Sequence, residues 1–157
     1  MTRRVVVRPG RGSDAPGLVA ALRDHHDFPG LPADPVAAQR QVEALVPDPE
    51  SLDRTLLVAE DGVGGIAGYA HWHVTYPLFL DGPSLYLTEL FVREEHRGGG
   101  IGGALLDALH DAATSLRASR VELVQVVDTA AARRGFYEGH GYDLADHLRV
   151  LRRPGPR

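Results

Sequence analysis

The sequence predicts a single α/β domain over residues 1–157, in which a mixed and mostly antiparallel sheet is flanked by helices. The length suits one domain with one core, and no repeat, low-complexity tract or internal linker divides it. The composition, 43% hydrophobic and 24% charged, is that of a globular protein. The apolar periodicity changes along the chain in the order strand, two helices, three strands, helix, strand, helix, strand.

In the first half, valines at 5–7 predict a strand over residues 4–8. Ser13 and Asp14 are typical N-cap residues, and they predict a helix that runs to about residue 25. Prolines and a glycine make 28–35 a loop, and Pro47 ends a second predicted helix over 36–46. Apolar runs predict strands over 54–60 and 66–75, which pair across the turn at 61–65.

In the second half, LYLTELFV at 85–92 is the most strand-like run. Strict alternation would place Leu85, Leu87, Glu89 and Phe91 on one face of that strand. Apolar residues at helical spacing predict a helix over 102–117. The remaining predicted elements are a strand over 121–127, a helix from 129 to about 138 that ends at Gly139 or Gly141, and a last strand over 144–151.

Charge and composition exclude several classes of function. The formal net charge of −4 argues against a nucleic-acid partner, and the arginines clustered near both ends are expected to be solvated. The absence of cysteine removes disulfides and thiolate catalysis. No apolar run approaches the length of a membrane span, and the start resembles no signal peptide. We therefore expect no membrane partner and a cytoplasmic location.

A glycine cluster is the strongest functional signal. Glycine fills five of the six positions from 98 to 103, just before the helix predicted over 102–117. A helix N-terminus presents unpaired N–H groups and partial positive charge, and glycines let an anion approach that backbone closely. The cluster predicts a phosphate or pyrophosphate site. A tight turn without ligand is the alternative, but one or two glycines would suffice for that.

Three phosphate-loop patterns can be compared with this stretch. The Gly-Lys-Ser/Thr end of the Walker loop is absent. The dinucleotide pattern G-x-G-x-x-G is present at Gly98, Gly100 and Gly103, but five charged or imidazole residues separate it from the preceding strand. The pattern R-x-x-G-x-G is matched by Arg97, Gly100 and Gly102.

The stretch LYLTELFVREEHRGGGIGGALL, with GFYEGHGY downstream and VVVRP at the start, resembles the GCN5-related N-acetyltransferases (GNAT), and more loosely their diamine and thialysine acetyltransferases. The resemblance implies a sheet that splays between strands 85–92 and 121–127, acetyl-CoA as acyl donor, and a homodimer. It implies that the coenzyme's pyrophosphate lies on the loop and its pantetheine along the preceding strand. The implied donor-binding residues are Leu90, Phe91, Val92, Arg97, Gly98, Gly99, Gly100, Ile101, Gly102 and Gly103.

Two residues are candidates for catalysis. An amine attacking a thioester must lose a proton, and the leaving thiolate can gain one. The resemblance implies that Tyr137 is the acid, with packing as the alternative role. Glu89 is the candidate base or amine anchor, because a carboxylate in so apolar a strand is costly unless it is paired, solvated or functional. Related diamine enzymes often carry two adjacent acids here, whereas Thr88 precedes Glu89, so a dicationic substrate is in doubt.

The acceptor site has weaker signals. The resemblance places Asp27, Phe28 and Tyr76 near it, and His71 and His73 share one face of a strand, where they could relay protons or line the pocket. Two histidines at this spacing without a third ligand argue against a metal. Where many relatives have a helix asparagine, this chain has Ala130, so Asp128 or Thr129 would have to replace that contact.

Together these features predict acetyl transfer from acetyl-CoA to a small primary amine, such as a polyamine, an amino acid or an aminoglycoside. The amine would attack directly in a ternary complex. Protein or peptide acetylation, a non-catalytic acyl-CoA-binding module and a nucleotide-dependent oxidoreductase remain alternatives.

Overall fold

The computed structural model describes residues 5–24, 34–45, 54–145 and 148–153. By its internal contacts the chain forms two units, Met1–Val124 and Gln125–Arg157, and each is described by itself. Among the described residues no helix is both long and apolar enough to cross a membrane.

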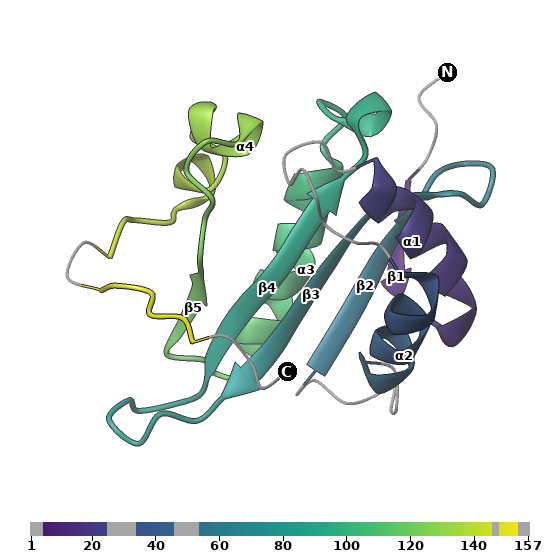
Figure 1. Cartoon of the computed structure of the whole chain (residues 1–157). Helices are drawn as coiled ribbons and strands as arrows, with labels where there is room; N and C mark the ends of the chain where they lie inside the picture. Colours follow the sequence, from purple (N-terminus) through teal and green to yellow (C-terminus); the bar gives the residue numbers. More distant parts are fainter. Residues whose placement is uncertain (1–4, 25–33, 46–53, 146–147, 154–157) are drawn as a thin grey trace. The chain divides into compact units, whose positions relative to one another are not determined.

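The first unit contains a five-stranded sheet in the order β1-β2-β3-β4-β5. Neighbouring strands are antiparallel except β4 and β5, which are parallel. The fold prediction is therefore confirmed (Figure 1). The elements are β1 (Val6–Pro9), the short 3-10 helix η1 (Gly12–Asp14), α1 (Ala15–Arg23), α2 (Pro35–Leu45), β2 (Arg54–Glu60), β3 (Ile66–Thr75), β4 (Ser84–Val92), the 3-10 helix η2 (Glu94–His96), α3 (Ile101–Ser115) and β5 (Arg120–Leu123).

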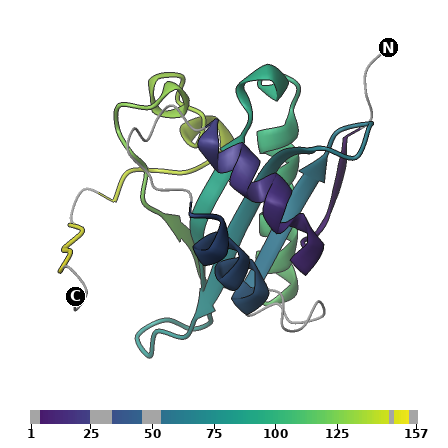
Figure 2. The same ribbon diagram turned by 45° about the vertical axis from the view of Figure 1, so that its right-hand side comes forward.

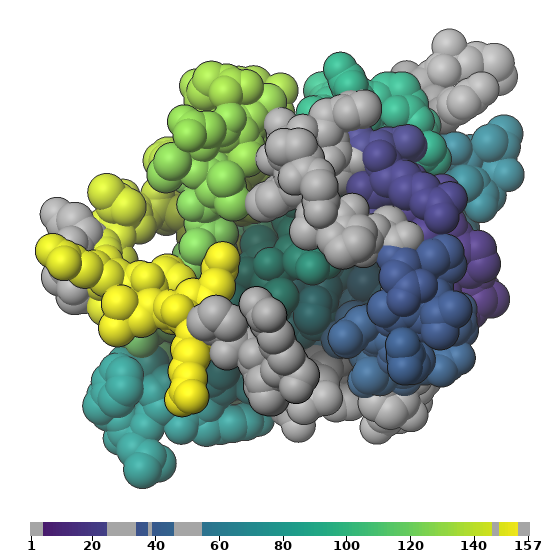
Figure 3. Space-filling model, viewed as in Figure 1, coloured from purple at the N-terminus to yellow at the C-terminus, as the bar shows by residue number. Residues whose placement is uncertain are grey.

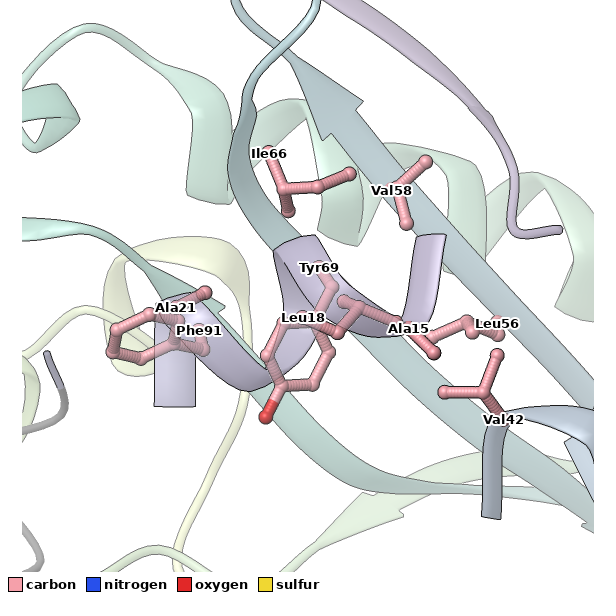
Figure 4. Packing of buried hydrophobic residues seen from close by; sticks show 9 residues of the cluster. All are labelled: Ala15, Leu18, Ala21, Val42, Leu56, Val58, Ile66, Tyr69 and Phe91. Carbon is pink, nitrogen blue, oxygen red and sulfur yellow. The ribbon is translucent and has the colours of Figure 1, made fainter. Parts of the chain in front are cut away.

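Helices cover both faces of this sheet, α1 and α2 on one face and α3 on the other (Figures 1 and 2). The apolar residues of α3 recur at helical spacing, and Leu105, Leu106 and Leu109 are fully buried. The opposite face packs against α1 and α2 through the cluster shown in Figure 4, whose members are Ala15, Leu18, Ala21, Val42, Leu56, Val58, Ile66, Tyr69 and Phe91.

The start of α1 is fixed by an ionic network. Asp14 occupies the predicted N-cap position, but its side chain makes no capping bond to α1. Its carboxylate instead accepts two hydrogen bonds from the Arg8 guanidinium, at 2.8 and 2.9 Å, and one from the Arg11 N–H at 2.7 Å. Arg8 also pairs with Glu60. The network links β1, η1 and β2 at the N-terminus of α1.

The sheet opens between β4 and β5. Their register runs only from Ser84–Arg120 to Leu87–Leu123, whereas β4 continues to Val92. This is the predicted splay. The strand predicted over 121–127 was too long, since β5 ends at Leu123.

A bulge in β4 overturns the predicted alternation. His71 pairs with Glu89 and Trp72 with Leu87, so Thr88 is an extra residue on β4. From this point the side chains change face. Glu89 and Phe91 lie on the face of His71 and Tyr69, not on the face of Leu85 and Leu87 as strict alternation required.

In the second unit the described elements are α4 (Ala130–Arg133) and the 3-10 helix η3 (Glu138–His140). The helix predicted from 129 to 138 was too long, because Gly135 takes a left-handed conformation (φ +62°) and interrupts it. The strand predicted over 144–151 was wrong, since none of its described residues is in a strand.

Candidate active site

The glycine loop leads into α3 with an exposed backbone. Gly98 and Gly100 have φ values of +76° and +82°, which L side chains rarely adopt. Gly100 is the N-cap of α3 and provides no side-chain cap, and the first helical bond runs from Ala104 N–H to its carbonyl. A Cβ atom at Gly98 or Gly100 would meet nothing within 4 Å. The loop thus leaves N–H groups at a helix start with open space beside them, which is the geometry an anion requires.

Two arginines fix the hinge between β4 and this loop. Arg97 donates a hydrogen bond from Nε to the Val92 carbonyl at 2.9 Å, which holds the start of the glycine loop against the end of β4. Arg93 pairs with Asp24, the last described residue after α1, and also with Glu95 at 3.3 Å. Its backbone N–H donates to the Ala67 carbonyl at 2.9 Å. The segment that leads into the glycine loop is therefore tied to β3, β4 and the end of α1.

One face of the central strands gathers polar and aromatic side chains. Tyr69, His71 and His73 of β3 share it with Tyr86 and Glu89 of β4. The carboxylate of Glu89 is exposed, whereas the two histidines are half-buried. This is the face of the sheet on which α1 and α2 pack. Figure 3 shows the teal surface of the central strands beside these helices. We call this set of five residues the acceptor face, after the role proposed for it below.

The bulge completes this face. Thr88, the extra residue, precedes Glu89 on β4, and its hydroxyl oxygen lies 3.2 Å from His73 Nδ1. The rings of His73 and Tyr86 are 5.2 Å apart between centroids. Without the extra residue, Glu89 would point toward α3 and the buried leucines. The bulge is therefore what places the carboxylate beside the histidines.

Tyr69 was missed by the sequence analysis. It is 5% exposed in the apolar cluster, and its pKa is raised well above the usual value, first by burial and then by the charge of Glu89 and a hydrogen bond with it. The available signal was the alternation of IAGYAHWHVT, which places Tyr69 on the same face as the two histidines.

In the second unit, Tyr137 lies in the turn before η3 rather than within α4. Its ring contacts Phe136 and Tyr142, with centroids 5.1 and 5.8 Å away. Burial raises the pKa of Tyr137 above its usual value of 10.0. Burial, with the nearby charge of Tyr137, raises the pKa of Tyr142 to about 12. Both phenols therefore keep their protons at neutral pH.

The other predicted residues are placed as follows. Tyr76 is 66% exposed and follows the end of β3, roughly 17 Å along the strand from His71 at ~3.3 Å per residue. Asp27 and Phe28 lie outside the described residues. Thr129 caps α4 by accepting from the Ala132 N–H at 3.2 Å. In the described parts of the chain, no group of three or more acidic or histidine side chains could hold a metal.

The sequence matches the acetyltransferase (GNAT) domain family over residues 53–144, more than half of the chain. The protein belongs to this family. The matched residues include β2 to β5 and the glycine loop.

Two curated proteins are similar to the same region. The chain is 33% identical over 90 residues to the L-ornithine N5-acetyltransferase NATA1 of Arabidopsis thaliana. The aligned region covers 57% of this chain and 39% of that protein. It is 31% identical over 84 residues to tyramine N-feruloyltransferase 10/30 of Nicotiana tabacum, covering 54% of this chain and 37% of the relative. The chain thus spans about two fifths of the length of these relatives.

Solved structures share the fold over nearly the whole chain. Glucosamine-6-phosphate N-acetyltransferase from Arabidopsis thaliana superposes with a TM-score of 0.73 and 18% identity, covering 98% of both chains. A ribosomal-protein-alanine N-acetyltransferase from Brucella melitensis biovar Abortus 2308 gives 0.75 and 21%, covering 95% of this chain and 99% of that one. At these identities the likeness concerns the fold alone.

Proposed function

We propose that the protein transfers the acetyl group of acetyl-CoA to the primary amine of a small molecule. The main support for this function is the glycine loop at the start of α3 in a chain of the GNAT family. The loop follows β4, which extends past its last pair with β5. The two curated relatives are named for acyl transfer to ornithine and to tyramine, which are small amines.

The donor would be held by the chain's own backbone. Gly98 to Gly103 offer N–H groups at a helix N-terminus to the pyrophosphate, while Arg97 keeps the loop against Val92. Leu90, Phe91 and Val92 lie beyond the last β4–β5 pair, where an extended pantetheine could add main-chain hydrogen bonds as a further strand does. Backbone N–H groups near Leu90 and Phe91 would polarise the thioester carbonyl, as an oxyanion hole does.

Glu89 would receive the amine. An exposed carboxylate on the acceptor face attracts the ammonium group and takes its proton, directly or through water, so that the nitrogen becomes a nucleophile. The new C–N bond forms as the C–S bond breaks. His71 and His73 would line the acceptor site, and Asp27, Phe28 and Tyr76 remain proposed contacts of the substrate.

Tyr137 would protonate the departing thiolate. Burial keeps this phenol protonated through neutral and mildly alkaline pH, as an acid in this role requires. The reaction then balances: the ammonium loses two protons on its way to the amide, one to Glu89 before the attack and one to water as the C–N bond forms, while Tyr137 gives one proton to the coenzyme sulfur and regains it from water. No covalent enzyme intermediate is needed.

The test is a panel of amines, monocations and dications, assayed for release of free thiol from acetyl-CoA. We expect saturable release with at least one small amine and none with NAD(P)H in place of the donor. Tyr137→Phe and Glu89→Gln should each lower turnover at least ~10-fold, since such groups typically contribute about 10²–10⁴-fold. Binding of NAD(P)H but not acetyl-CoA, measured by calorimetry, would contradict the proposal.

Matched controls separate chemistry from folding. Tyr142→Phe makes the same change five residues after Tyr137 and should retain most activity. Glu43→Gln removes an exposed carboxylate of α2 that accepts a hydrogen bond from Gln39, and it should leave turnover unchanged. Acetyl-CoA binding without turnover on any amine or peptide would favour the non-catalytic binding module.

A further inference from the structure

Tyr69 connects the apolar core to the acceptor face. Its ring is packed under α1 in the apolar cluster, with its centroid 5.9 Å from that of Phe91. Figure 4 shows its phenol oxygen at the margin of this cluster, directed away from the surrounding apolar side chains. On β3 it lies two residues before His71, the strand partner of Glu89.

The buried hydroxyl requires a hydrogen-bond partner. A phenylalanine would pack equally well among these neighbours, and a hydroxyl at so buried a position is costly unless it is hydrogen-bonded. Glu89 is diagonal to Tyr69 on the same face of the β3–β4 pair, and after burial its charge and hydrogen bonding account for the raised pKa of the phenol. Because the phenol keeps its proton, it is the donor and the carboxylate accepts.

We propose that Tyr69 is a positioning residue that holds Glu89 in the orientation in which it receives the amine. This inference rests on the proposed function, because it takes Glu89 as the group that meets the substrate. An exposed glutamate samples several rotamers, and ordering it costs entropy. A donor fixed to the core by its own ring selects one of them, and a carboxylate has further lone pairs for the incoming amine.

The direct test is Tyr69→Phe, which removes the hydroxyl and keeps the ring. We expect kcat/KM for the amine to fall about tenfold, as when one hydrogen bond to a charged group is lost. The KM for acetyl-CoA should not change, because the glycine loop does not contact this hydroxyl in the described structure. A change confined to the thermal midpoint, with wild-type kcat/KM, would overturn the proposal.

A double-mutant cycle shows whether Tyr69 acts through Glu89. In the Glu89→Gln background, Tyr69→Phe should cost less than about twofold. A full tenfold loss in that background would overturn the proposal, because the hydroxyl would then act independently of the carboxylate. If Glu89→Gln alone retained wild-type turnover, the proposed role of Glu89 would fail instead, and the two failures are thus distinguishable.

A second readout needs no activity. Tyrosine Cζ carbons, labelled with ¹³C and assigned with the Tyr69→Phe variant, report phenol ionisation by NMR. In Glu89→Gln the pKa of Tyr69 should fall toward the usual value yet stay above it, because burial remains while the charge and the hydrogen bond are gone. An unchanged titration of Tyr69 would show that the hydrogen bond is absent and would overturn the inference.

Discussion

The substitution Gly100→Ala tests whether the glycine loop binds the acyl donor. Gly100 has φ +82°, and a Cβ there would point into open space. The methyl group therefore creates no internal clash, but the left-handed conformation costs roughly 1–2 kcal/mol for a residue with a Cβ. For a chain of this size each kcal/mol corresponds to about 2–4 °C in the thermal midpoint.

The effect on binding should be larger than this strain. If the pyrophosphate occupies the space beside Gly100, a methyl group displaces it from the N–H groups of the helix start. Hydrogen bonds to a charged group contribute about 1.5–3 kcal/mol, and ~1.4 kcal/mol is a factor of ten in Kd. We therefore expect acetyl-CoA affinity, measured by calorimetry, to fall about 10- to 100-fold.

Gly64 provides a matched control. It lies in the turn between β2 and β3 with φ +86°, and a Cβ there also meets nothing within 4 Å. Gly64→Ala should lower the thermal midpoint as much as Gly100→Ala and leave acetyl-CoA affinity unchanged. Equal affinity in the two variants would refute the assignment of the loop, because strain alone would then explain both.

Three further predictions concern the rest of the chain. Asp14→Asn should lower the free energy of unfolding in urea by about 1–3 kcal/mol. Hydrogen bonding to Arg8 lowers the pKa of Asp14, so this difference should be full above pH 3.8, the usual value, and vanish as the pH falls through the lower folded value. The pKa of Tyr142 is about 12 in the folded protein and about 10 in the unfolded chain, so the free energy of unfolding should fall as the pH rises from 10 to 12. Alkaline unfolding curves of Tyr142→Phe should lack this part of the pH dependence. Deleting Thr88 should destabilise the protein far more than Thr88→Ala, as measured in urea, because deletion removes the bulge and turns Glu89 toward α3.

Much of the fold was predictable because it depends on local patterns. The buried stripe of α3 follows from helical spacing, and β2 and β3 have the predicted bounds. The elements after β5 were not predictable in the same way. Gly135 ends α4 early because it adopts a left-handed conformation, which a run of good helix formers before it does not reveal. The apolar alternation at 144–151 resembles a strand, but a strand requires a partner as well as a pattern.

The acceptor face shows a different limit of sequence reasoning. LYLTELFV contains no glycine or proline that marks a bulge, and strict alternation placed Glu89 on the buried face with Leu85 and Leu87. That assignment carried its own contradiction, because an unpaired carboxylate among leucines is costly. One extra residue, Thr88, resolves it by moving the carboxylate to the face of Tyr69 and His71. The cost of a buried carboxylate indicates that the alternation is irregular near Glu89. Only the pairing of β3 with β4 shows that the irregularity is a bulge at Thr88, which moves Glu89 to the other face.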